Sequence, residues 1–143
     1  MLGTRIKKSK NDGITDKVFS LLPLKNGDSV LLTGTDLGRA VRIFAVKGCY
    51  VDVTSSFAAD RAMDFPRVGK AAPFTDCDGL YDYVVFINSY LPEYNEKAHS
   101  LLDEGGRLII FNRSADPGFT APDGQFAREI LITDGFTFYS GKK

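Results

Sequence analysis

The sequence predicts a three-layer α/β/α sandwich around a mostly parallel β-sheet. Apolar runs of strand length alternate with segments whose apolar residues recur at helical spacing. This alternation is typical of right-handed strand–helix–strand crossovers in one sheet. The run at residues 29–33 is continuously apolar rather than alternating, which indicates a strand covered on both faces. A chain of 143 residues fits one such domain.

Helical spacing marks the first expected helix, which carries Ile14, Val18, Leu21 and Leu22. Asp12 or Thr15 is its candidate N-cap. Before the middle of the chain we expect, in order, a helix over 14–22, a strand over 29–33, a helix over 39–47 ended by Gly48, a strand over 50–54 and a short helix over 58–63.

The second half repeats the alternation. We expect a weak strand over 68–72, a strong strand over 81–88, a helix over 93–102, a turn over 104–106, a strand over 107–111, a helix over 125–133 and a final strand over 135–141. This gives about six strands, a truncated sheet in which one edge strand is missing. An uncovered sheet edge is a liability, so we expect a protein partner or a second copy of the chain to cover it.

Composition leaves several classes of function without support. Eighteen basic residues balance eighteen acidic ones, so no overall charge supports binding to nucleic acid or to a membrane surface. No apolar run reaches the ~20 residues that span a bilayer. The basic stretch 5–10 falls in an expected flexible tail, residues 1–13, before a single domain over 14–143; a phosphate-contacting arm is the alternative.

Few residues here suit metal or histidine chemistry. The only histidine is His99, and Cys49 and Cys77 lack metal-ligand spacing. We therefore expect no metal site, two cysteines that serve packing, and a reduced, cytoplasmic location.

Four stretches of sequence follow one another along the chain, each containing an expected strand: "SVLLTGTDLGRA", "GCYVDVTSS", "AAPFTDCDGLYDYVVFINSYL" and "SLLDEGGRLIIFN". Together they resemble the class I S-adenosylmethionine-dependent methyltransferases over about residues 14–112. The resemblance implies a Rossmann-like methyltransferase sheet, with S-adenosylmethionine, if any cofactor, at the carboxyl ends of the strands.

The residues of the implied cofactor loop depart from the family's pattern. Motif I of the family reads acid-x-G-x-G-x-G, whereas this chain has Leu32 at the acid, then Gly34, Asp36 and Gly38. The family's ribose-binding acid of the second strand falls at Thr54 or Ser55. Its adenine-contacting acid falls near Lys70 or Ala71, so all three carboxylate positions differ.

Neutral hydroxyl groups could take over some of these contacts. The cofactor-binding candidates are Thr33, Gly34, Thr35, Asp36, Gly38, Thr54, Ser55 and Asn88. A shift of the alignment by one or two positions would instead promote Asp52 or Asp76. At the substrate end the resemblance implies Asn88 and Tyr90, but no catalytic residue is identified.

Three functions fit these residues. The first, which the lost carboxylates and the short chain favour, is a pseudoenzyme: a methyltransferase-like domain that serves as a structural or regulatory partner. The second is a divergent, active methyltransferase for a small molecule or a partner-presented substrate, since methyl transfer needs little beyond positioning. The third is a binder of another nucleotide or small ligand at the same strand ends.

Overall fold

The computed structural model describes residues 10–35, 37–54, 65–114, 119–122 and 124–143. Its strands are β1 (Ser29–Gly34), β2 (Tyr50–Val53), β3 (Val68–Lys70), β4 (Tyr81–Ile87), β5 (Leu102–Asn112), β6 (Ala127–Thr133) and β7 (Thr137–Lys142). Its helices are α1 (Lys10–Phe19), α2 (Gly38–Val46) and α4 (Asn95–Ser100), with the 3-10 turns η1 (Phe74–Asp76) and η2 (Pro92–Tyr94).

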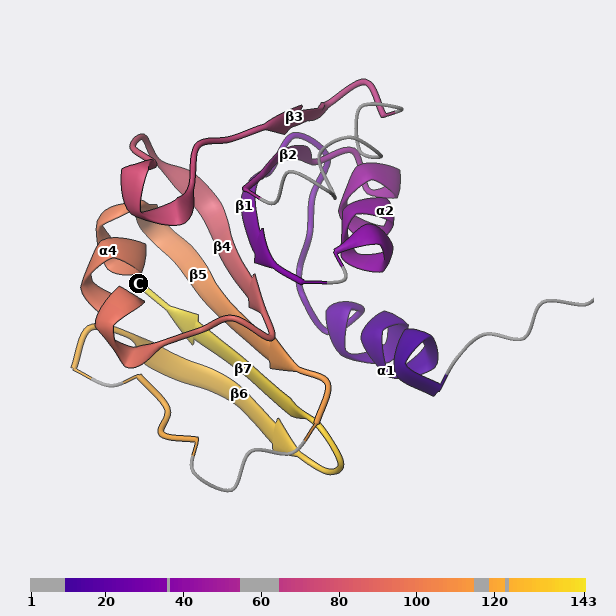
Figure 1. The fold of residues 1–143 in the computed structure, drawn as a ribbon, viewed down its shortest axis with the longest axis vertical. Coiled ribbons are helices and arrows are strands. Elements are labelled where there is room, and N and C mark those ends of the chain that lie inside the picture. Colours follow the sequence, from indigo (N-terminus) through magenta and orange to yellow (C-terminus); the bar gives the residue numbers. More distant parts are fainter. Residues whose placement is uncertain (1–9, 36, 55–64, 115–118, 123) are drawn as a thin grey trace, which may run out of the picture.

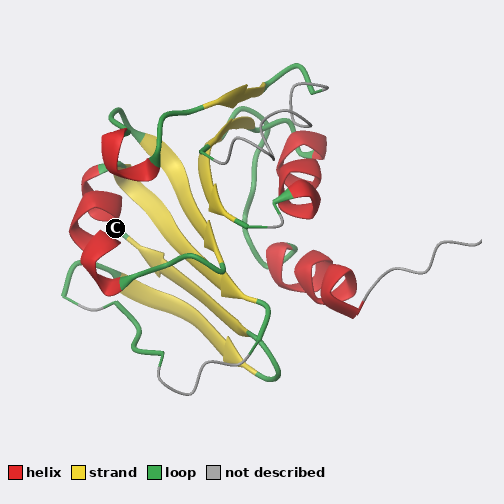
Figure 2. Ribbon diagram, viewed as in Figure 1, coloured by secondary structure: helices red, strands yellow, loops and turns green. Residues whose placement is uncertain are grey.

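All seven strands form one sheet in the order β3-β2-β1-β4-β5-β7-β6. Neighbours from β3 to β5 are parallel, and β7 pairs antiparallel with both β5 and β6. In Figure 1, α1 and α2 lie on one side of the sheet and α4 lies on the other. Figure 2 shows the same three layers by secondary structure, so the predicted α/β/α sandwich is confirmed.

Two apolar cores fill the spaces between the layers. Along β4, Tyr83, Val85 and Ile87 point into the core under α1 and α2. The alternate residues Val84 and Phe86 point into the core under α4 and η1. Because successive strand residues face opposite sides, a strand covered on both faces must be apolar throughout, and this is what the continuous apolar runs encode.

The prediction of about six strands is wrong because residues 125–133, predicted as a helix, contain strand β6. The segment pairs with β7 from Ala127 to Thr133 across a short turn at Asp134 and Gly135. Aspartate followed by glycine between two apolar runs is a hairpin signal. The sheet is therefore complete, and the argument from a missing edge strand no longer holds.

Several bounds also differ from the prediction. Helix α1 begins at Lys10, so neither Asp12 nor Thr15 can be its N-cap. The expected turn over 104–106 lies inside β5. Strand β4 pairs with Leu102 and next with Arg107, so the β5 residues between these two form a bulge. The basic stretch 5–10 and the short helix over 58–63 fall mostly or wholly outside the described residues.

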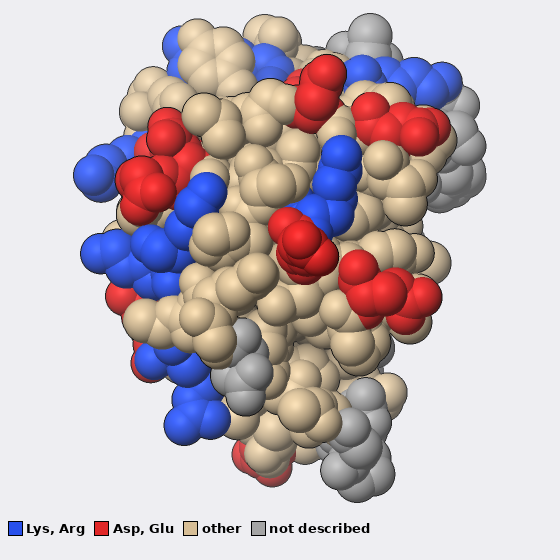
Figure 3. Space-filling view, turned by 90° about the vertical axis from the view of Figure 1, so that its left-hand side faces the viewer, with Lys and Arg blue, Asp and Glu red and all other residues tan. Residues whose placement is uncertain are grey.

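The surface and the cysteines agree with the composition. On the face drawn in Figure 3, acidic and basic side chains are interspersed and neither sign covers the face. Cys49 and Cys77 are free thiols, and both are buried as expected of packing residues. His99 of α4 packs edge-on against Phe126 at 5.3 Å between ring centroids. Among the described residues, no helix is long and apolar enough to cross a membrane, and no three metal-ligating side chains gather in one place.

Candidate functional site

The strand order reverses between β1 and β4, whose carboxyl ends lie side by side. Thr33 pairs with Phe86 and Gly34 pairs with Ile87. Ligands of open α/β sheets bind at such a switch point, and a hollow of about 500 Å³ opens there. Its described walls are Thr33, Gly34, Thr35, Thr54, Pro73, Phe74, Thr75, Ser89 and Tyr94.

Hydroxyl groups of β1 and of the residue after β2 meet in the lining of this hollow. The Thr54 hydroxyl donates to the Thr33 hydroxyl oxygen at 2.6 Å. The Ser89 hydroxyl donates to the Thr33 backbone oxygen at 3.4 Å. Since the Thr33 and Thr54 hydroxyls bond to each other, part of their capacity to bind a ligand is already taken.

Two aromatic residues, Phe74 and Tyr94, also line the hollow. The Phe74 ring lies 5.1 Å from the Tyr94 ring and 4.9 Å from the Phe86 ring, centroid to centroid. Phe86 and Tyr94 stack with 8° between their planes. The "PF" pair at Pro73 and Phe74 was a sequence landmark, but no local pattern indicated that Tyr94 and Ser89 would join them.

The two glycines of the loop have different structural roles. Gly34 has φ +131°, and a Cβ atom there would lie 1.9 Å from the Ile87 carbonyl oxygen. The close approach of β1 to β4 therefore requires Gly34. Gly38, the first residue of α2, is exposed and would have no atom within 4 Å of an added Cβ. Gly38 is thus the glycine that the packing of the described residues does not require.

Asn88 forms hydrogen bonds that join the ends of two strands. It has φ +55°, its N–H donates to the Phe111 carbonyl oxygen at 2.9 Å, and its side-chain oxygen accepts from the Arg113 N–H at 2.9 Å. These bonds join the ends of β4 and β5, and Asn88 does not line the hollow. Tyr90 donates to the Asn95 side-chain oxygen at 3.4 Å, and burial raises the pKa of Tyr90, which keeps its hydroxyl protonated.

The alternative acids lie elsewhere. The Asp52 carboxylate accepts a hydrogen bond of 2.6 Å from the Tyr81 hydroxyl. Burial, and then this bond to Asp52, raise the pKa of Tyr81. Asp76 is exposed at the end of η1, and neither acid lines the hollow. Asp36 and Ser55 lie outside the described residues, so their candidacy stays a prediction.

No protein-family model matches the sequence, and no curated protein matches it. Many solved structures match the fold. N-methyltransferase NodS from Bradyrhizobium japonicum matches with a TM-score of 0.72 and 12% identity, over 96% of this chain and 99% of that chain. A Burkholderia thailandensis 1,6-didemethyltoxoflavin N1-methyltransferase, solved with S-adenosylhomocysteine, matches with a TM-score of 0.67 and 19% identity, over 93% and 76%.

A third structure, the magnesium protoporphyrin IX methyltransferase of Synechocystis with bound S-adenosylmethionine, matches with a TM-score of 0.65 and 16% identity, over 93% of this chain and 77% of that chain. This chain has the class I methyltransferase fold. Identities this low show the fold and leave the activity to be argued from the site.

Only part of S-adenosylmethionine fits the described walls of this methyltransferase-fold site. Threonine hydroxyls can accept and donate hydrogen bonds, and the rings of Phe74 and Tyr94 suit a flat, apolar group. The cofactor also carries a sulfonium, an amine and a carboxylate. None of the described lining residues is charged, so the described walls supply no charged partner for these groups.

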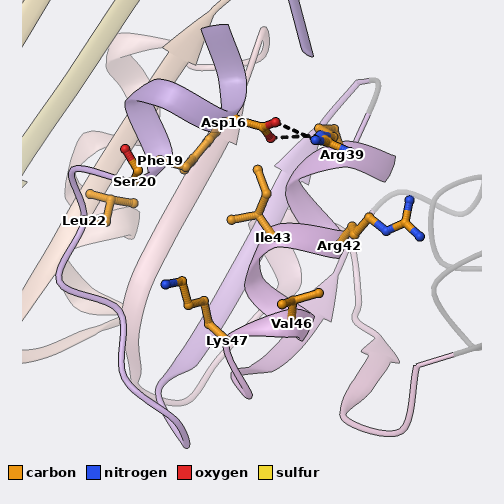
Figure 4. Close-up of a pocket in the computed structure, with 9 residues that line it drawn as sticks. All are labelled: Asp16, Phe19, Ser20, Leu22, Arg39, Arg42, Ile43, Val46 and Lys47. Carbon is orange, nitrogen blue, oxygen red and sulfur yellow. Dashed lines mark hydrogen bonds and ion pairs between the residues drawn. The ribbon is translucent and has the colours of Figure 1, made fainter. Parts of the chain in front are cut away.

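A second hollow, of about 360 Å³, lies between α1 and α2 (Figure 4). Phe19, Leu22, Ile43 and Val46 line it. The ion pair drawn there joins Asp16 of α1 to Arg39 of α2, with 2.9 Å between the Arg39 Nε and an Asp16 carboxylate oxygen. We therefore assign this hollow to the packing of the two helices.

Proposed function

We propose that this chain is a methyltransferase-fold domain that does not turn over S-adenosylmethionine and that acts as a structural or regulatory protein. The observation that carries the proposal is the uncharged lining of the described strand-end hollow, where Thr33 and Thr54 bond to each other. A hydrogen bond to a charged group contributes about 1.5–3 kcal/mol. Losing the ribose carboxylate alone therefore weakens binding about ten- to hundredfold.

Calorimetric titration of the whole chain with S-adenosylmethionine and S-adenosylhomocysteine tests this function. The proposal expects no heat of binding up to millimolar ligand. Thr54→Asp restores a carboxylate beside the Thr33 hydroxyl, which lies 2.6 Å from the present Thr54 hydroxyl. This variant should gain affinity by about ten- to hundredfold.

Thr75→Asp is the matched control, because it adds the same charge to another wall of the hollow. A gain confined to Thr54→Asp supports a cofactor site that has lost its acid. An equal gain in both variants would show only that the hollow attracts cations. Micromolar binding by the unaltered chain would overturn the proposal.

The second candidate is a divergent, active methyltransferase. The hollow of about 500 Å³ at the switch point and the open space around Gly38 favour it. In this case the unaltered chain binds the cofactor saturably through neutral hydroxyls. Thr33→Val and Thr54→Val, which remove these hydroxyls at nearly constant volume, should then weaken binding. Stabilisation by another nucleotide, without any response to S-adenosylmethionine, would indicate the third function.

A further inference from the structure

The outer edge of β6 has no neighbouring strand in the described part of the sheet. β6 ends the strand order and pairs only with β7. No residue of β6 is fully buried, and Leu131 is 38% exposed. Figure 1 shows β6 at the outer margin of the sheet. An edge strand of seven residues presents a row of backbone donors and acceptors to any strand that approaches.

The hairpin geometry shows which amides point outward. The Asp134 N–H donates to the Phe136 carbonyl oxygen, so Thr133 and Thr137 form a pair that is not hydrogen-bonded. Pair types alternate along an antiparallel ladder. Leu131, opposite Tyr139, is therefore also in a pair that is not hydrogen-bonded. The N–H and C=O groups of Leu131 and Thr133 consequently point away from β7, toward the open edge.

The other edge of the sheet is protected in the usual way. Strand β3 has only three residues and ends in the exposed Lys70, with Arg67 immediately before it. Short length and charge are the common devices that prevent edge pairing. In β6, residues 130–133 carry no charge. Charge and the bulge protect only the start of β6, at Arg128 and Glu129, so residues 130–133 are the part of this edge that is open to pairing.

We infer that β6 pairs antiparallel with β6 of a second copy of this chain, about a twofold axis at Leu131. Such an axis places each residue opposite a residue of the same strand in the other copy. Leu131 faces its own counterpart, and its outward amides form the two central hydrogen bonds. Ile130 lies opposite Ile132 of the second copy, which extends the core beneath α1, where both isoleucines already pack.

Charge complementarity selects this register. Counting from Leu131, Arg128 falls opposite Asp134 of the second copy, and this pair occurs twice. Both residues are exposed, and neither side chain has a hydrogen bond or ion pair within the described part of the chain. The other charged residue of β6, Glu129, already forms an ion pair with Arg107 at 2.7 Å. The bulge between Arg128 and Ile130 confines regular pairing to residues 130–132, because Thr133 falls opposite Glu129, and the long Arg128 side chain spans the remainder.

Sedimentation equilibrium and light scattering over a range of protein concentrations test this inference. The expected mass is twice the 15.7 kDa of the chain. Leu131→Lys places two ammonium groups face to face at the axis and should yield the monomer. Arg128→Glu or Asp134→Lys alone should weaken the dimer, because each variant opposes like charges. The double variant Arg128→Glu, Asp134→Lys restores opposite signs and should restore the dimer.

Lys70→Glu on β3 is the control for charge at the other edge, and it should leave the mass unchanged. All the altered side chains are exposed, so each variant should fold. Circular dichroism on heating checks this. A monomer at every concentration, or a dimer that Leu131→Lys does not dissociate, would overturn the inference. A single charge variant that dimerises as well as the double variant would overturn the register.

Discussion

Gly34→Ala tests whether the fold, rather than a ligand, requires the first glycine of the loop. The new Cβ would lie 1.9 Å from the Ile87 carbonyl oxygen and 2.8 Å from its carbon. Both are backbone atoms, so they cannot rotate away. A non-glycine residue at φ +131° adds strain of about 1–3 kcal/mol, and overpacking adds about 1–3 kcal/mol. We expect the free energy of unfolding to fall by about 2–6 kcal/mol.

Urea denaturation followed by circular dichroism measures this loss, since the chain has no tryptophan to report by fluorescence. Gly38→Ala is the matched control, because its Cβ would meet no atom within 4 Å. We expect the control to change stability by less than about 1 kcal/mol, or to increase it. If the two variants lost the same stability, the close approach of β1 to β4 would not explain Gly34.

Two further predictions concern stability. Burial, and then the charges of Asp28 and Asp82, raise the pKa of the Cys49 thiol from 9.0 to about 11. The unfolded chain therefore loses this proton first, so the stabilising contribution is complete below pH 9 and is lost by pH 11. Unfolding free energies across this range should fall less steeply in Cys49→Ala; an unchanged slope would contradict the assignment. Asp82→Ala removes the acceptor of the Ser29 N–H at 2.9 Å and should cost about 1–3 kcal/mol in chemical denaturation, with a smaller loss in Asp82→Asn. Equal losses in the two Asp82 variants would contradict a role as acceptor.

The candidate site shows how far a local motif can lead. The loop after β1 was located correctly, because an apolar strand followed by glycines and a helix is a local pattern. The pattern does not distinguish the two glycines. Gly34 is fixed by the carbonyl of Ile87, a residue far away in the sequence, whereas Gly38 meets no packing constraint from the described residues. The Asn88 side-chain oxygen likewise accepts a hydrogen bond from the Arg113 N–H because β5 ends beside β4.

The sequence alone determined the class of fold. Continuous apolar runs mark strands covered on both faces, and helical spacing marks the helices between them, so β1, α2, β2 and β4 were predicted close to their observed bounds. Helix α2 ends as expected, with Gly48 at φ +84°. These signals are local, because burial on one side or on both imposes a period on neighbouring residues.

Only the tertiary structure decided the fate of residues 127–133. Ala127, Arg128, Glu129 and Leu131 favour helix by intrinsic propensity, yet the segment is strand β6 because β7 offers it a complete ladder across the turn at Gly135. The tertiary structure also exposed the outer edge of β6 and brought Phe74 and Tyr94 together. Propensity differences of a few tenths of a kcal/mol per residue are outweighed by pairing and packing with distant residues, which no local pattern records.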